Sequence, residues 1–97
     1  MRWLLLIRPE AEADLIAARD WYDGKGAGLG DRFLDSVADA MREVEENPAR
    51  SPLYYQNFRR VLLQSFPYKI FFQVIEQRVI VFRVLHVRQC HERGLFK

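Results

Sequence analysis

The sequence predicts one α+β domain with the element order β-α-α-β-β-β, in which a helical hairpin packs on a mainly antiparallel sheet. In the first half of the chain apolar residues recur at helical spacing, whereas the second half holds short runs rich in Val, Ile, Phe and Tyr that are typical of strands. The chain has 97 residues, 49% of them hydrophobic, which suffices for one core and is too short for two. Residues 1–97 are therefore expected to form a single domain.

The first half predicts a strand followed by two helices. An apolar strand is expected over residues 2–7, and Pro9 is well placed to open a helix that extends to about Tyr22. Four glycines between Asp23 and Gly30 then separate this helix from a second one, which runs from about residue 27 or 29 to Glu46. The apolar stripe of the second helix consists of Leu29, Phe33, Val37, Met41 and Val44. We expect Leu15, Trp21, Phe33, Val37 and Phe72 in the core.

The second half predicts an antiparallel meander of three strands over residues 58–64, 68–75 and 79–87. A three-residue turn at Glu76–Arg78 places the even positions of the last two strands on one face, under the helices: Tyr68, Ile70, Phe72, Val74, Ile80, Phe82, Val84 and His86. The other face is then mixed and more open: Lys69, Phe71, Gln73, Val79, Val81, Arg83 and Leu85. A two-residue turn would instead bury Arg83 opposite Ile70, and burying an unpaired guanidinium is costly.

Charge is distributed unevenly along the chain. Residues 1–50 hold seven Lys/Arg and eleven Asp/Glu, about −4, and residues 51–97 hold eight Lys/Arg and two Asp/Glu, about +6. The positive half suits an acidic protein or phosphates, although acidic helices alone also produce such a pattern. The single cysteine, Cys90, fits a reducing compartment. The apolar run Trp3–Ile7 is too short to act as a signal-peptide core or to span a bilayer, so we expect a cytoplasmic protein with no membrane role.

A cluster of polar residues ends the last strand: His86, Arg88, Cys90, His91 and Arg93. The histidines could serve as acid and base, because imidazole titrates near pH ~6.5. His86 could equally be structural, beside Tyr68 at the strand end, and His91 could be a solvated tail residue. A metal site from His86, Cys90 and His91 lacks a fourth ligand and a recognised spacing. The acidic row Asp31, Asp35, Asp39 and Glu43 is typical of a solvated helix face, and the glycine-rich segment lacks the context of a phosphate-binding loop.

Several short signatures, in order along nearly the whole chain, resemble the RelE/ParE superfamily of bacterial type II toxin–antitoxin toxins. They are Asp20-Trp21-Tyr22, Asn47-Pro48, Arg59-Arg60, Phe66-Pro67-Tyr68 and Leu85-His86 followed by Arg88. The family's layout agrees with the element order read from periodicity. The resemblance implies a toxin neutralised by a ParD-like or similar antitoxin in a hetero-oligomer, with no cofactor or metal.

The family divides by target. RelE-like members cut mRNA on the ribosome, and ParE-like members poison DNA gyrase; the signatures favour ParE. RelE-like enzymes commonly place a tyrosine in the C-terminal tail, and here no tyrosine follows Val87. We predict that the partner or target binds Arg59, Arg60, Lys69, Arg83, His86 and Arg88. In the alternative of a metal-independent endoribonuclease, the catalytic candidates are Arg60, Arg83, His86 and Arg88. A non-toxic, antitoxin-binding member is a third reading.

Overall fold

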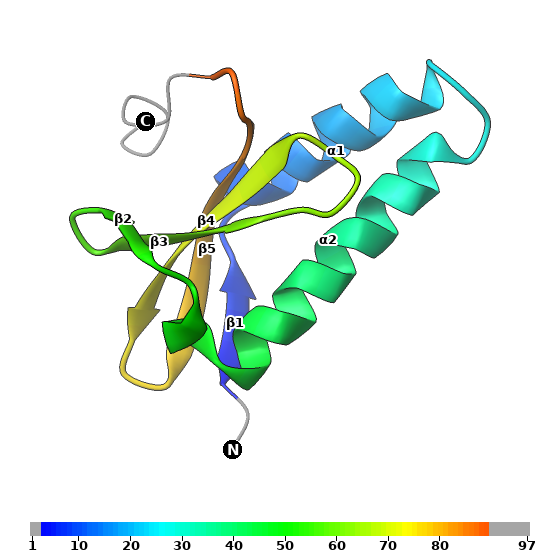
Figure 1. The fold of residues 1–97 in the computed structure, drawn as a ribbon. Coiled ribbons are helices and arrows are strands. Elements are labelled where there is room, and N and C mark those ends of the chain that lie inside the picture. The colour runs from blue at the N-terminus through cyan, green and yellow to red at the C-terminus, as the bar shows by residue number, and fades with distance from the viewer. Residues whose placement is uncertain (1–2, 90–97) are drawn as a thin grey trace.

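The structure, a computed structural model, describes residues 3–89 and consists of two helices packed on one mixed sheet (Figure 1). The elements are β1 (Leu4–Ile7), α1 (Pro9–Asp23), α2 (Leu29–Glu46), the 3-10 helix η1 (Pro48–Arg50), β2 (Leu53–Tyr55), β3 (Phe58–Leu62), β4 (Tyr68–Ile75) and β5 (Arg78–His86). The predicted α+β class and the order of the six predicted elements are confirmed. The additional strand β2 lies between the second helix and the predicted meander, where the sequence predicts no strand.

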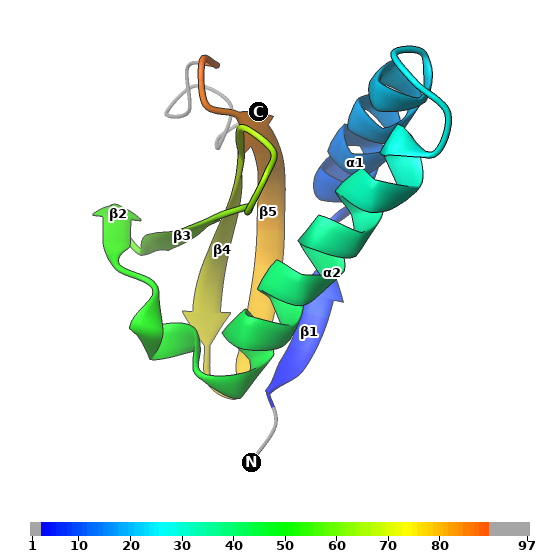
Figure 2. The same cartoon turned by 45° about the vertical axis from the view of Figure 1, so that its right-hand side comes forward.

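The sheet has the order β1-β5-β4-β3-β2, so the first strand of the chain pairs with the last one. β1 runs parallel to β5, and every other neighbouring pair is antiparallel. Both helices cover the same face of the sheet (Figure 2). We call the other face, which no described helix covers, the distal face. No helix among residues 3–89 is long and apolar enough to cross a membrane.

The helices are held on the sheet by two different kinds of apolar surface. The stripe of α2 is strongly one-sided, and Phe33, Val37, Met41 and Val44 are all buried in the main core. In α1 the buried residues are small, Ala11 and Ala18, which brings the helix backbone close to the sheet. Of the predicted core, Phe33, Val37 and Phe72 are buried, and Leu15 packs against the core while partly buried.

The prediction for Trp21 was wrong, because its side chain is 57% exposed. Adjacent residues of a helix point about 100° apart, so Trp21 and Tyr22 cannot both face the sheet. Tyr22 takes the inward position, where its ring lies 5.4 Å from that of Phe33 and 4.9 Å from that of Phe66. Trp21 is left on the outer side of α1, edge-on to Tyr22.

The predicted register was right at one end of the β4–β5 hairpin and wrong at the other. The turn has two residues, Glu76 and Gln77, and near it Phe72 pairs with Val81. An irregularity between Phe71 and Phe72 then inserts one extra residue, Phe82, into β5. From there Phe71 pairs with Arg83, as the three-residue turn required. A β-bulge thus avoids placing Arg83 opposite Ile70 without lengthening the turn.

The bulge redistributes side chains between the two faces. Val79 and Val81, expected on the open side, are fully buried in the main core beneath the helices. Ile80 and Phe82, expected beneath the helices, are half-buried, and Phe82 packs against a second cluster on the distal face. Phe58, Phe71 and Leu85 are the buried members of that cluster, so the centre of the distal face is a small core of its own.

Candidate functional site

The six predicted binding residues do not form one site in the structure. Arg60 and Lys69 lie on the distal face, because β-strand alternation places them on the side of Phe71. Arg59 points to the other side, where its guanidinium donates to the backbone oxygen of Ser51 at 2.6 Å. The other three candidates lie at or near the end of β5: Arg83 contacts α1, His86 lines a cleft, and Arg88 is exposed in the following turn.

Arg60 and Lys69 form a pair of cations supported by aromatic rings. The Arg60 guanidinium lies 4.4 Å from the centre of the Tyr54 ring, which in turn lies 5.5 Å from that of Phe71. The pKa of Lys69 is lowered by partial burial and by the nearby charge of Arg60. Among residues 3–89 neither cation has a carboxylate within ion-pair distance. Two adjacent cations of this kind favour an anionic group from outside the described chain.

Arg83, by contrast, is held by a carboxylate. Its guanidinium donates two hydrogen bonds to Asp14 of α1, from Nε at 2.6 Å and from the terminal nitrogen at 2.9 Å. The backbone N–H of Val84 donates to the same carboxylate at 3.0 Å. This bidentate pair raises the pKa of Arg83 further above its usual value, mainly through the hydrogen bond to Asp14. We call these three residues the Asp14 clasp, and it joins α1 to the bulge of β5.

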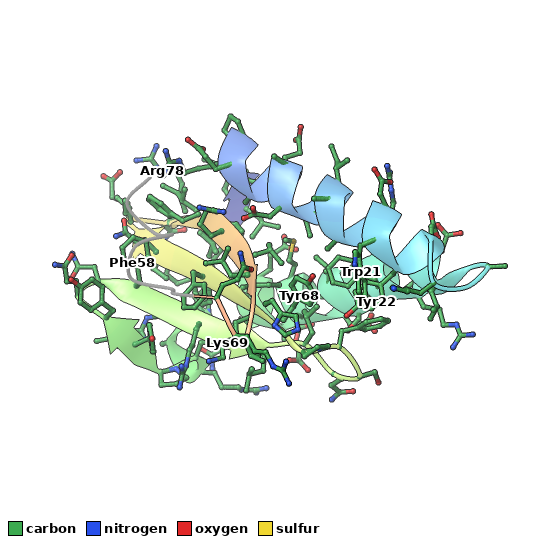
Figure 3. The ribbon with its side chains drawn as sticks, turned by 90° about the horizontal axis from the view of Figure 1, so that it is seen from above. Trp21, Tyr22, Phe58, Tyr68, Lys69 and Arg78 are labelled. Carbon is green, nitrogen blue, oxygen red and sulfur yellow. The ribbon has the colours of Figure 1, made fainter. Side chains whose placement is uncertain are left out.

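A cleft of about 590 Å³ opens between α1 and the adjoining ends of β4 and β5. Its lining is mostly apolar and aromatic: Asp14, Ala17, Ala18, Trp21, Tyr22, Pro67, Tyr68, Val84, His86 and Gln89. In Figure 3, Trp21, Tyr22 and Tyr68 gather beside α1, away from Phe58 on the distal face. Burial raises the pKa of both Tyr22 and Tyr68, so their phenols are protonated at neutral pH and are poor bases.

His86 is built into the end of β5. It pairs with Tyr68 across the strands, and the two rings meet edge to face with centres 5.2 Å apart. The imidazole Nδ1 of His86 accepts a hydrogen bond from the backbone N–H of Arg88 at 3.1 Å, and the backbone N–H of His86 donates to the side-chain oxygen of Gln89 at 2.6 Å. The structural interpretation of His86 beside Tyr68 therefore matches its contacts.

The remaining polar residues of the predicted end cluster, Cys90, His91 and Arg93, lie outside the described residues. Within residues 3–89 no group of three or more His, Cys, Asp or Glu side chains could hold a metal ion. Two residues that matter here were missed by sequence reasoning, Asp14 and Tyr54. Asp14 lies within the first predicted helix and Tyr54 lies between predicted elements, so the sequence pattern carried no signal for the partner of either residue.

Comparison with known proteins identifies the family. The profile described as "ParE toxin of type II toxin-antitoxin system, parDE" matches residues 5–90, which is most of the chain. The chain belongs to the ParE toxin family. This confirms the resemblance to the RelE/ParE superfamily, and it makes the protein by family a type II toxin–antitoxin toxin. No curated protein sequence matches it.

Solved structures with the same fold include ParE and RelE toxins at low sequence identity. The chromosomal ParDE system of P. aeruginosa gives a TM-score of 0.77 at 18% identity, covering 88% of this chain and 96% of that one. The RelBE2 complex of Mycobacterium tuberculosis gives 0.63 at 18% identity, covering 89% and 99%. A variant of E. coli RelE in the free state gives 0.63 at 18% identity, covering 97% and 93%. At 18% identity, the similarity to these structures shows only that the chain has the same fold.

Proposed function

We propose that this ParE family member is the toxin of a type II module that acts on DNA gyrase and is neutralised by a co-encoded antitoxin. Gyrase works on chromosomal DNA, so this proposal places the toxin in the cytoplasm. The single observation that carries the proposal is the separation of the residues that RNA cleavage would require. Support also comes from the ParE family match and from solved relatives that are complexes of a toxin with an antitoxin.

Metal-free RNA cleavage needs a base, an acid and cations around one phosphate. Of the four candidates, Arg83 forms an ion pair with Asp14. His86 packs on Tyr68 on the face of the sheet that the helices cover. Arg60 lies on the distal face, so the sheet separates it from His86. This arrangement favours a role for these residues in binding, because they do not assemble into one nuclease site.

The cation pair Arg60–Lys69 is the part of the predicted set that best suits recognition of the target or partner. It is exposed enough to be reached, and among the described residues it has no carboxylate of its own. A carboxylate from a bound protein would relieve the repulsion between these cations, because opposite charge favours the charged form of lysine. Loss of either cation is expected to slow association, since charged surfaces steer encounter.

One observation favours the endoribonuclease alternative. The cleft beside α1 holds an imidazole and two protonated phenols, from His86, Tyr22 and Tyr68, and Arg88 lies next to it. These groups could supply a general acid and a cation if RNA entered the cleft. Removal of a true general acid or base costs about 10²–10⁴-fold in rate, whereas loss of one imidazole contact costs on the order of 1–2 kcal/mol of affinity.

Inducible expression with two readouts tests the proposal. Cells producing the toxin are scored for a DNA damage response and for ribosome-dependent mRNA cleavage, in the wild type, in Arg60→Ala and in His86→Ala. The proposal predicts DNA damage without mRNA cleavage, weakened in Arg60→Ala and largely retained in His86→Ala. Cleavage of mRNA that disappears in a folded His86→Ala variant would support the nuclease instead. A folded wild type that produces neither signal and still binds the antitoxin would identify a non-toxic member.

A further inference from the structure

The carboxylate of Asp14 lies where an oxyanion ligand of β5 would bind. It accepts two hydrogen bonds from the Arg83 guanidinium, at 2.6 and 2.9 Å, and a third from the backbone N–H of Val84 at 3.0 Å. A guanidinium and a backbone N–H that converge in this way are donors suited to a carboxylate or a phosphate. We call these two donors the β5 oxyanion site. The donors belong to β5 and the acceptor to α1, so the chain fills this site with its own side chain.

The β5 oxyanion site adjoins the cleft beside α1. Asp14 and Val84 both line this cleft, together with the rings of Trp21, Tyr68 and His86. Figure 3 shows Trp21 and Tyr68 on the same side of the molecule, beside α1. Without the Asp14 carboxylate, the cleft would offer a phosphodiester a guanidinium and a backbone N–H, and would offer a base aromatic rings for stacking. Such a combination is suited to single-stranded RNA.

The negative charge of Asp14 extends into the cleft. The pKa of Tyr68 is raised first by burial and then by the charge of Asp14, so the carboxylate acts on a ring of the cleft wall. The pKa of Arg83 is raised mainly by its hydrogen bond to Asp14, with a smaller contribution from the charge of Glu10. A phosphate in the cleft would therefore meet a negative field and a guanidinium that is already neutralised. Repulsion of this kind is stronger in partly buried surroundings than in water.

The clasp differs from the other ion pairs of residues 3–89. Those four pairs join residues at most three positions apart, and all of their side chains are at least 38% exposed. Surface pairs of that kind contribute little. The side chains of Arg83 and Asp14 are 19% and 15% exposed, and 69 positions separate the two residues. The fold itself thus brings a carboxylate to Arg83, whereas Arg60 has none within ion-pair distance in the described chain.

We propose that Asp14 is a specificity-determining residue, which occupies the β5 oxyanion site and thereby excludes the phosphodiester backbone of RNA from the cleft. The cleft contains an imidazole and two phenols, but a phosphate cannot reach Arg83 while the carboxylate is in place. This inference deepens the proposed function and rests on it in one respect, namely that RNA is not the target. The property that it predicts, the affinity for RNA, is measured without gyrase.

Fluorescence anisotropy of a short, end-labelled single-stranded RNA tests the inference with the purified full chain. Asp14→Asn removes the charge but keeps the shape and an oxygen that can accept from the Val84 N–H. This variant is expected to bind the RNA about tenfold more tightly than the wild type, the equivalent of one added charged hydrogen bond. The logarithmic salt dependence should steepen by about 0.7 for one added phosphate contact. Asp14→Asn/Arg83→Gln should lose this gain.

Asp39→Asn is the matched control. It also removes one carboxylate beside an arginine, but on the exposed face of α2, where Asp39 pairs with Arg42. Its affinity for the RNA is expected to differ less than twofold from that of the wild type. Thermal melts establish that each variant is folded. A gain in affinity that requires Arg83 does not arise from a loss of structure, so this measurement separates a specificity role from a purely structural one.

A measurement on the wild type needs no variant. The side-chain Nε–H signals of the arginines are followed by nuclear magnetic resonance while inorganic phosphate is added. The signal of Arg60 is expected to shift, because this residue has no carboxylate within ion-pair distance in the described chain. The signal of Arg83 is expected to stay in place, because Asp14 already accepts from its Nε at 2.6 Å. Equal shifts of the two signals would overturn the inference even if Asp14→Asn did not fold.

The outcomes distinguish this inference from the proposed function. A folded Asp14→Asn variant with unchanged affinity, an equal gain in Asp39→Asn, or a gain that persists without Arg83 overturns the role of Asp14 and leaves the gyrase proposal standing. The expected affinities in a toxin that has no effect on gyrase overturn the gyrase proposal alone. Cleavage of mRNA by the wild type that is lost in a folded His86→Ala variant overturns both, because RNA would then enter the cleft with Asp14 in place.

Discussion

The Asp14 clasp offers the sharpest quantitative test of the fold. The side chains of Arg83 and Asp14 are 19% and 15% exposed, so both charges are largely removed from water. Asp14→Ala leaves the guanidinium without its two hydrogen bonds and leaves the Val84 N–H without its acceptor. Breaking a buried ion pair by removing one partner costs about 3–5 kcal/mol, and residual solvent access lowers this to about 2–4 kcal/mol here.

Urea denaturation measures this loss, with Asp39→Ala as the control. Asp39 pairs with Arg42 on the exposed face of α2, where both side chains are more than 60% exposed, so its removal should change the unfolding free energy by less than about 0.5 kcal/mol. The double variant Asp14→Ala/Arg83→Ala should recover part of the loss, because no unpaired charge remains. A cost below about 1 kcal/mol for Asp14→Ala, or equal costs in the two single aspartate variants, would refute the structural role of the clasp.

Other predictions concern the core, the tyrosines and the cation pair. Phe72→Ala should cost roughly 3–5 kcal/mol of stability, whereas Trp21→Ala should cost less than about 1 kcal/mol; similar costs in urea melts would place Trp21 inside. Burial raises the pKa values of Tyr22 and Tyr68 in the folded state, so their protonated phenols favour the folded state. This contribution to stability is present below pH 10.0 and is lost as the pH rises through the folded-state pKa values. The wild type should thus lose stability above pH 10.0 more steeply than Tyr22→Phe/Tyr68→Phe, and Lys69, present in both, cancels in the comparison. Lys69→Gln should slow association with the antitoxin at low salt and less so at high salt, as stopped-flow measurements would reveal; an effect independent of salt would argue against a charge role.

The fold was largely predictable because the hydrophobic period changes clearly at the middle of the chain. The stripe of α2 and the strand-rich second half led to the correct order of elements and to most of the core. The bulge at Phe82 could not be read from the pattern, since a two-residue turn with a bulge and a three-residue turn give the same pairing beyond it. The cost of burying an unpaired guanidinium was a valid reason to reject the pairing of Arg83 with Ile70. In the structure the guanidinium also has a partner, Asp14, which lies 69 positions away in sequence.

The candidate site was predicted as a list of basic residues and not as a geometry. Arg83, His86 and Arg88 were predicted as binding candidates together, but strand alternation and the bulge direct their side chains to different surroundings. The neighbours that give each residue its character come from other elements: Tyr54 beside Arg60, Tyr68 beside His86, and Asp14 beside Arg83. The exposed edge of β1 was also hidden, because the sequence predicts only a short apolar strand there and not its place in the sheet.

The claim that toxicity runs through gyrase is tested most directly with purified components. The toxin is incubated with gyrase, supercoiled plasmid and ATP, and in parallel with ribosomes carrying mRNA, and the products are examined after denaturation of the protein. The account predicts linear DNA from trapped gyrase cleavage complexes and intact mRNA. Cleavage of mRNA at the ribosomal A site with no linear DNA would contradict it.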